Sequence, residues 1–280
     1  MLVAVGAALG SEVRSQRTVH GGDVAAAAQV QLADGRVVFA KTRDGAEPDT
    51  FRTEADGLRW LDVAGAVQVP PVLAVLSEPP ALVLEWVEAG HRAPDEARFG
   101  TELATLHLAG APCFGRQDRR VTGSRSLPNE PFDTWTESYA HNRLLPLADL
   151  AEREGALPAT AVVGLRSIAA RLEQLGGPPE PPARLHGDLW AGNRIVDASG
   201  TSWLVDPAAH GGHRAFDLAM MRLFGGFAPA AFGSYDDAHP LADGWRERVH
   251  LHQLAPLVVH AVKFGRGYVG AAVAAIDRYR

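Results

Sequence analysis

The feature that most constrains the fold is a change of pattern near Glu88. Before this residue, short strand-like runs surround one stretch with helical spacing, in the order strand, strand, helix, strand, strand. A turn signal at Asp34-Gly35 joins the first two strands into a hairpin. The predicted elements are the strands Ala26–Leu32, Arg36–Thr42, Val72–Leu76 and Ala81–Glu85, and the helix Pro48–Val63.

After Glu88 the helical spacing dominates. A Gly/Pro-rich break at Gly176–Pro182 precedes a dense stretch from Leu185 to Gly226, which holds most of the chemically active residue types. This succession predicts an α+β, bilobal fold with a small β-rich N-lobe, residues 1–87, and a larger α-helical C-lobe, residues 88–280. The predicted helices of the second part are Arg98–Leu108, Phe132–Leu145, Pro158–Leu175 and Asp243–Arg280.

The composition is that of a soluble globular protein, with 46% apolar and 21% charged residues among 280. A net charge of −6 argues against a nucleic-acid partner. The single cysteine, Cys113, excludes an intrachain disulfide and fits a reducing cytoplasm, which is the location we expect. The apolar run Met1–Gly10 lacks a basic start and is too short to span a membrane, so it predicts a helix ahead of a strand near Thr18.

The strongest chemical signal is the segment Leu185–Asn193, with the sequence LHGDLWAGN. Asp188 is followed five residues later by Asn193, which is the spacing of a kinase catalytic loop. In such a loop the Asp orients the acceptor hydroxyl or takes its proton, and the Asn holds a metal ion. A predicted hairpin then ends at Asp206, where a second ligand for Mg²⁺ is expected. An HGD tripeptide alone is a weak signal, but the combined spacing favours phosphoryl transfer.

An independent signal lies upstream at Lys41, which ends the second strand of the hairpin. A lysine at the end of the third strand of a kinase N-lobe contacts the α- and β-phosphates of ATP. Its ion-pair partner is expected on the next helix, where Glu54 lies one turn from the start. Gly21 and Gly22 could bring backbone amides close to phosphate, although a plain β-turn explains this pair equally well.

Several features of protein kinases are missing from the sequence. There is no Gly-x-Gly-x-x-Gly loop, no Asp-Phe-Gly and no Ala-Pro-Glu, and the expected metal ligand reads Asp206-Pro207-Ala208. An activation segment that docks peptides is therefore not expected. The pattern favours a small-molecule acceptor.

The segment Leu185–Asn193 resembles the catalytic loop of the fructosamine kinase family, which belongs with the aminoglycoside and choline kinases in the protein-kinase-like fold. Trp190 after HGDL is a mark of this family. The resemblance spans roughly the whole chain. Further matching segments are Gly21–Asp23, Phe114–Gly115, Asp206–Ala208, Gly212–His213, Asp217–Met220, Leu223–Phe227, Leu251–Leu254 and His260–Arg266.

The resemblance implies a role for each residue of the phosphoryl-transfer machinery. Asp188 is expected to be catalytic and to face the sugar hydroxyl. Asn193 and Asp206 are the expected Mg²⁺ ligands. Lys41 and Glu54 are the expected phosphate-binding lysine and its ion-pair partner.

The resemblance also implies the surroundings of the reacting groups. The backbone of Glu85 and Val87 is expected to meet adenine as a hinge. Trp190 and His260 are expected to line the pocket for the sugar and its amine. Asp217 is expected to brace the catalytic loop from the beginning of a helix.

The histidines raise the alternative of a zinc site. His210 and His213 have suitable spacing, but no HExxH motif or cysteine pair accompanies them, which disfavours zinc. His186 is predicted to have a structural role beside the catalytic loop. His213 is either a satisfied loop histidine or a pocket residue that binds substrate, and the sequence leaves both open.

The sequence therefore predicts an ATP- and Mg²⁺-dependent kinase for the 3-hydroxyl of a ketosamine, either fructosamine or ribulosamine, with a role in deglycation. The acceptor is either a small molecule or a protein-bound ketosamine. Departures from the family at Val24–Ala28 and Arg116–Asn129 put acceptor specificity, rather than phosphoryl transfer, in question. The alternative is an aminoglycoside- or choline-type phosphotransferase. A nucleotide-binding pseudokinase is disfavoured because all five core polar residues are present. No partner membrane or nucleic acid is expected.

Overall fold

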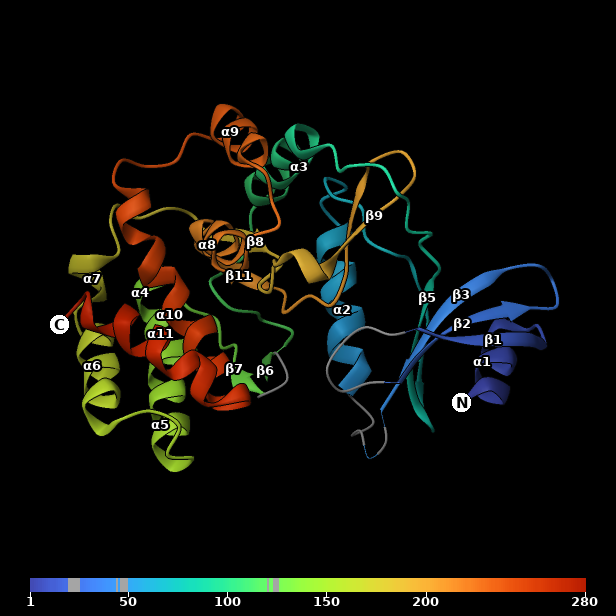
Figure 1. The fold of residues 1–280 in the computed structure, drawn as a ribbon, viewed down its shortest axis with the longest axis horizontal. Coiled ribbons are helices and arrows are strands. Elements are labelled where there is room, and N and C mark those ends of the chain that lie inside the picture. The colour runs from blue at the N-terminus through green and yellow to red at the C-terminus, as the bar shows by residue number, and fades with distance from the viewer. Residues whose placement is uncertain (20–25, 44, 46–49, 120, 123–125) are drawn as a thin grey trace. The chain divides into compact units, whose positions relative to one another are not determined.

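The computed structural model describes residues 1–19, 26–43, 45, 50–119, 121–122 and 126–280 (Figure 1). Gly21 and Gly22, the candidate phosphate-binding turn, lie outside these residues. The chain forms two compact units, and each unit combines two segments. The β unit consists of Met1–Asp95 and Gly192–Pro207, and the helical unit consists of Glu96–Ala191 and Ala208–Arg280.

The β unit is built on a five-stranded antiparallel sheet with the strand order β1-β2-β3-β5-β4. The expected hairpin and the two later strands are confirmed, with boundaries that differ by a residue or so. Sheet residues from β2, β3 and β5, among them Val30, Ala40 and Val83, pack in one core cluster with Val5. The strands are β1 (Val13–Val19), β2 (Ala26–Leu32), β3 (Val37–Thr42), β4 (Val72–Ser77) and β5 (Pro80–Glu85).

Two helices complete the first segment of the β unit. Helix α1 (Leu2–Leu9) contributes Val5 to the cluster on one face of the sheet. Helix α2 (Thr50–Asp62) falls within the predicted range, and its helically spaced apolar residues Phe51, Ala55, Leu58 and Leu61 are all buried. Because successive side chains of a strand point to opposite faces, Lys41 points away from the face on which Ala40 packs.

A second hairpin, β9 (Arg194–Val196) and β10 (Ser202–Leu204), joins the β unit through backbone hydrogen bonds. The Gly90 N–H donates to the Val196 carbonyl at 2.8 Å, and the Leu204 N–H donates to the Gln68 carbonyl at 2.8 Å. A Cβ at Gly90 would lie 2.5 Å from the backbone of Ala198, so only glycine fits there. These contacts explain why the β unit runs to Asp95 and includes residues 192–207, whereas the sequence placed the lobe boundary at residue 87.

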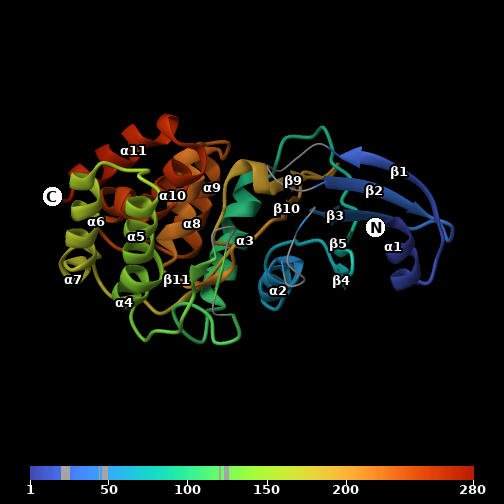
Figure 2. The ribbon, with the colours of Figure 1, turned by 90° about the horizontal axis from the view of Figure 1, so that it is seen from below.

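The helical unit contains most of the helices of the described residues (Figure 2). The predicted helix Pro158–Leu175 is interrupted at Ala170, and the predicted helical region Asp243–Arg280 is divided at Gly265, which has φ 73°. No helix in the described parts of the chain is long and apolar enough to cross a lipid bilayer. The helices are α3 (Glu96–Leu108), α4 (Trp135–Tyr139), α5 (Leu145–Arg153), α6 (Ala159–Ala169), α7 (Leu172–Leu175), α8 (Ala215–Phe224), α9 (Pro229–Ala238), α10 (Trp245–Phe264) and α11 (Arg266–Asp277), with a π-helical turn at Ala140–Leu144 and a 3₁₀ turn at Ala191–Asn193.

Short strand pairs link the loops of this unit. Strand β8 (Ala183–Leu185) pairs with β11 (His210–Gly212), and β6 (Val121–Thr122) pairs with β7 (Leu127–Pro128). The β8–β11 pair matters for function because the HGD segment follows β8 directly.

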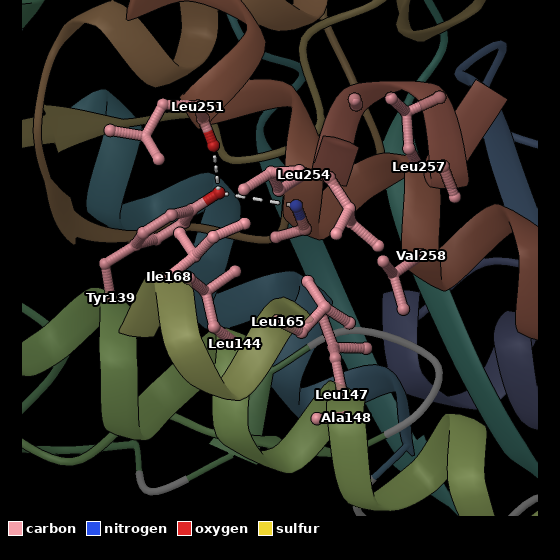
Figure 3. Packing of buried hydrophobic residues seen from close by; sticks show 14 of the residues in the cluster. Tyr139, Leu144, Leu147, Ala148, Leu165, Ile168, Leu251, Leu254, Leu257 and Val258 are labelled. Atoms are coloured by element: carbon pink, nitrogen blue, oxygen red, sulfur yellow. Dashed lines mark hydrogen bonds between the residues drawn. The ribbon is translucent and has the colours of Figure 1, made fainter. Parts of the chain in front are cut away.

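The core of the helical unit lies between α5, α6 and α10, where leucine side chains interdigitate (Figure 3). Tyr139 lies beside an interruption in the backbone hydrogen bonding of α10. Pro256 lies inside α10 and has no N–H for the carbonyl of His252. The Tyr139 hydroxyl donates to the Leu251 carbonyl at 2.8 Å and accepts the Ala255 N–H at 3.3 Å, so it bridges the turn of α10 that contains Pro256; the His252 carbonyl lies 3.3 Å from the same hydroxyl. Cys113 is buried in this unit, as expected for a small core residue.

Candidate active site

Three charged side chains of the β unit meet at the end of β3. The Lys41 ammonium lies 2.9 Å from Glu54 Oε2 on α2, and it also forms an ion pair with Asp206, which follows β10. The side chains of Lys41 and Glu54 are 17% and 16% exposed, whereas that of Asp206 is 42% exposed. The sequence-predicted pair is therefore present, and the tertiary structure adds Asp206 to it.

One ammonium in this cluster faces two carboxylates. Burial would lower the pKa of Lys41, but the charges of Glu54 and Asp206 outweigh it and raise this pKa, so Lys41 stays cationic. Burial raises the pKa of Glu54, the Asp206 carboxylate adds to this effect, and Lys41 opposes it. Two carboxyl groups thus share one ammonium, and a further cation beside Asp206, the more exposed of the two, would be stabilised.

Asn193 and Asp206 lie at the open end of the β9–β10 hairpin. The Val205 N–H donates to the Asn193 carbonyl at 3.0 Å, which extends the pairing of Leu204 with Arg194 by one step. Asp206 has φ 53°, in the left-handed region that is uncommon for residues other than glycine, asparagine and aspartate. An amide oxygen and a carboxylate oxygen are hard donors, and this pair fits Mg²⁺, which needs only one or two protein ligands beside phosphates and water.

The residues expected to meet adenine lie where the sheet ends. Glu85 is the last residue of β5, and its N–H donates to the Pro71 carbonyl at 2.9 Å. Val87 follows two residues later, outside any helix or strand, next to Trp86, whose indole N–H donates to Glu88 at 2.7 Å. The Glu85 side chain is exposed, so only the backbone of this segment is held in place by the sheet.

In the helical unit, Asp217 holds the backbone of the HGD segment. It lies in the first turn of α8 and is fully buried. Its Oδ2 accepts the N–H of His186 at 2.8 Å, and its Oδ1 accepts that of Gly187 at 2.9 Å. The N–H of Asp188 donates to Nδ1 of His186 at 3.2 Å, which completes the turn. Burial would raise the pKa of Asp217, but these donors and His107 hold it below its ordinary value, so the group is a carboxylate.

The glycine of the HGD segment is required by geometry. Gly187 has φ +82°, and a Cβ at this position would lie 2.1 Å from the carbonyl oxygen of Ala208. This close approach follows from the pairing of β8 with β11, in which Leu185 lies opposite His210. Any side chain would push the catalytic loop away from β11.

Aromatic side chains form a strip that begins at the catalytic loop. We call Trp190, Phe224, His260, Phe264 and Tyr268 the aromatic strip. The Trp190 ring, 40% exposed, meets Phe224 edge-on with 6.0 Å between centroids, and Phe224 lies 4.9 Å from His260. His260 continues the strip to Phe264 at 5.4 Å and to Tyr268 at 5.0 Å. The sequence predicted two members of this strip; the ring contacts of the other three required the fold.

His213, predicted as a substrate-binding or a loop residue, is buried and internally satisfied. Its Nδ1 accepts the N–H of Ala215 at 3.1 Å, and its Nε2 lies 3.8 Å from Glu180. Its ring packs edge-on against Trp135 at 5.2 Å. The hydrogen bond from Ala215 fits the role of a loop histidine, and a contact of His213 with substrate stays a prediction. His186, predicted to be structural, is fully buried beside the loop.

Three buried histidines make the helical unit sensitive to acid. Burial lowers the pKa of His210 to about 3 and that of His213 to about 4, and it also lowers the pKa of His252. Unfolding exposes all three, so between pH 6.5 and 4 the unfolded chain binds up to three more protons and stability falls as pH falls. Glu54 acts in the opposite sense because its folded pKa is raised. We therefore expect a net uptake of about two protons on unfolding near pH 5, measured by urea denaturation across this range.

His252 provides the matched variant. Neither of its ring nitrogens has a hydrogen-bond partner among the described residues, and its ring packs on Trp135 at 5.0 Å. His252→Leu should lower the proton uptake by one and raise stability at pH 5 by about 1 kcal/mol or more. An unchanged pH slope in this variant would show that His252 is protonated in the folded protein.

The comparison with known protein families shows to which family this chain belongs. The model of the family described as fructosamine kinase matches residues 4–280. This chain belongs to the fructosamine kinase family. A probable ketoamine kinase of Synechocystis sp. is 35% identical over 263 residues, which cover 91% of this chain and 87% of the relative. The ketosamine-3-kinase of Mus musculus is 29% identical, with 94% of each chain covered.

Solved structures agree with this membership of the fructosamine kinase family. A crystal structure from Thermobifida fusca, named as a candidate fructosamine-3-kinase, superposes with a TM-score of 0.91 at 39% identity and covers 99% of this chain and 97% of that one. An aminoglycoside phosphotransferase bound to ADP superposes with a TM-score of 0.66 at 12% identity, which shows a shared fold. The protein-kinase-like fold predicted from the sequence is confirmed.

Sequence reasoning missed the residues behind Asp217. His107 on α3 contacts this carboxylate and Tyr235 on α9 contacts His107, both from helices that are far away in the sequence. The segments that carry them have no motif spacing of their own. From the sequence alone, a histidine within a helix is interpreted as a core residue, because its hydrogen-bond partner on another helix is not known.

Proposed function

We propose that this protein transfers the γ-phosphoryl group of ATP to the 3-hydroxyl of a ketosamine, a fructosamine or ribulosamine, as a step of deglycation. The observation that carries this proposal is the cluster of Lys41, Glu54 and Asp206 in a chain of the fructosamine kinase family. The names of the relatives agree: the mouse protein is a ketosamine-3-kinase, and a relative from Oryza sativa, 30% identical over 264 residues, is a protein-ribulosamine 3-kinase.

On the nucleotide side, Lys41 binds the α- and β-phosphates, and Glu54 holds its ammonium in place. The backbone of Glu85 and Val87 meets adenine. Asn193 and Asp206 would hold Mg²⁺, which when bound neutralises charge on the phosphates. A phosphate contact from Gly21 and Gly22 remains a prediction.

On the acceptor side, Asp188 receives the proton of the sugar hydroxyl while the hydroxyl oxygen bonds to the γ-phosphorus. The bond between this phosphorus and the oxygen that bridges to the β-phosphate breaks, and ADP leaves with that electron pair. Asp217 keeps the loop of Asp188 in shape through two backbone hydrogen bonds. Trp190 and His260 offer ring faces to the apolar side of the sugar and to its cationic amine.

The test is ADP release from MgATP against a panel of acceptors: fructosyl-, ribulosyl- and erythrulosyl-lysine, an aminoglycoside and choline. The Asp188→Asn variant is the blank. Turnover on a ketosamine, absent from the blank, is the expected result. Turnover on the aminoglycoside or choline alone would overturn the acceptor. No turnover on any acceptor, with ATP still bound, would overturn the kinase activity.

A further inference from the structure

We propose that His107 and Tyr235 are positioning residues that fix Asp217 as the anionic acceptor of the catalytic loop. This inference rests on the proposed function, because the loop matters only if Asp188 takes part in phosphoryl transfer. It assigns a task to two buried polar residues that neither bind nucleotide nor contact the acceptor in the mechanism above.

The contacts form a short chain that ends at the catalytic loop. His107 Nε2 lies 3.3 Å from Asp217 Oδ2, and His107 Nδ1 lies 2.8 Å from the Tyr235 hydroxyl. The same Asp217 oxygen accepts the N–H of His186. His107 is 3% exposed, and Tyr235 and Asp217 are fully buried, so no water competes for these contacts.

The positions of the protons on His107 and Tyr235 follow from the Asp217 carboxylate, which can only accept hydrogen bonds. A carboxylate has no proton to give, so Nε2 of His107 must carry the hydrogen that points at Asp217. Nδ1 of a neutral His107 is then an acceptor, and the Tyr235 hydroxyl donates to it. Tyr235 thus selects the tautomer of His107 that serves Asp217, in the way that a second group orients a ligating histidine.

Packing of α3 against α9 brings His107 and Tyr235 together. A Cβ at Gly100 would lie 2.1 Å from the carbonyl oxygen of Ala231, so the two helices approach as closely as backbones can. At the far end, burial raises the pKa of the Tyr235 hydroxyl and Arg214 opposes this rise, while Arg214 forms a two-pronged ion pair with Glu180 at 2.7 and 2.9 Å. Arg214 directly precedes α8, the helix that carries Asp217, so the interactions of Tyr235 lead back to the helix of Asp217.

Removing the imidazole should change how Asp217 holds the loop. Burial raises the pKa of Asp217, and the hydrogen bond from His107 is the largest of the contacts that lower it, so removing His107 raises this pKa and shifts the group toward its protonated form. A protonated carboxyl of Asp217 accepts the N–H groups of His186 and Gly187 more weakly than a carboxylate does. The loop of Asp188 is then held less firmly. Binding of ATP, which uses Lys41 in the other unit, should be unaffected.

The test compares three variants and one control. His107→Leu removes both ring nitrogens, His107→Gln keeps a donor within reach of Asp217, and Tyr235→Phe removes only the hydroxyl that sets the tautomer. Leu103→Ala is the control, because Leu103 is fully buried on the same helix and contributes no polar atom to this network. The readouts are kcat, KM for ATP, the pH dependence of kcat, Tm, and hydrogen exchange of the peptide that contains His186 and Gly187.

We expect His107→Leu to lower kcat at least 10-fold with KM for ATP changed less than twofold, and to move the acidic limb of kcat to higher pH. Tyr235→Phe should lower kcat several-fold, and His107→Gln should recover most of the loss. The rate of hydrogen exchange in the peptide that contains His186 and Gly187 should rise at least 10-fold in His107→Leu. It should not rise in Leu103→Ala when the two variants are compared at conditions in which they are equally far below their Tm.

Two results would overturn the proposal. One is a kcat in His107→Leu within twofold of the wild type. The other is unchanged exchange in the 186–187 peptide. If the wild-type enzyme turns over no acceptor, the proposed function fails on its own, and the exchange measurement still decides whether His107 and Tyr235 hold the loop.

Discussion

Replacing Asp188 by Asn is expected to lower kcat about 10³-fold while the affinity for ATP stays within a factor of about two. The amide cannot take the proton of the acceptor hydroxyl, and general-base catalysis contributes 10²–10⁴-fold in enzymes. The residue is nearly isosteric, and its backbone N–H still donates to His186. Turnover is measured by ADP release at saturating ketosamine, and binding by calorimetry with MgADP.

The matched control is Asp197→Asn, in the turn of the β9–β10 hairpin. Asp197 accepts hydrogen bonds from Ser199, Thr201 and Trp203, and it has no part in the proposed mechanism. This variant should keep kcat within about twofold, at some cost in stability. Near-wild-type turnover in Asp188→Asn would remove Asp188 from the reaction.

Replacing Lys41 by Met is expected to lower kcat/KM for ATP by about 10²–10³-fold. The variant loses the ammonium that neutralises the transferring phosphates, a type of contact that costs several kcal/mol of transition-state stabilisation when removed. It also leaves the Glu54 and Asp206 carboxylates without their shared cation. Breaking a buried ion pair from one side costs about 3 kcal/mol, so Tm should fall as well.

The double variant Lys41→Met/Glu54→Gln separates these two effects. Neutralising Glu54 removes the uncompensated charge, so the double variant should recover most of the lost stability and none of the lost activity. Glu54→Gln alone should lower kcat/KM about 10-fold, because Lys41 keeps Asp206 as a partner. Recovery of activity in the double variant would mean that Lys41 acts only through stability.

The sequence by itself determined the local elements and the chemistry class. The strand-like runs of β2 and β3, the Asp34-Gly35 turn and the helical spacing of Phe51, Ala55, Leu58 and Leu61 each depend on neighbours a few residues apart, and the structure confirms the hairpin and the helix. The spacing of Asp188 and Asn193 and the segments around them were enough to identify the fructosamine kinase family.

Boundaries inside the helical part were less predictable because tertiary contacts override local signals. Pro256 lies inside α10, where Tyr139, 112 residues before Leu251, donates to the Leu251 carbonyl and accepts the Ala255 N–H. Helix α9 was not predicted, and α8 was expected only through the helix beginning at Asp217, since short helices with mixed faces are fixed by what they pack on.

Only the tertiary structure decided which charged residues meet. Lys41 and Asp206 are 165 residues apart, and His107 lies 110 residues from Asp217 and 128 from Tyr235. It also decided that His213 is buried, and that the hairpin 194–204 belongs with the β unit. The physical reason is that periodicity and spacing report the environment of neighbouring residues along the chain, whereas ion pairs and buried hydrogen bonds depend on which distant segments the folded backbone brings within about 3 Å.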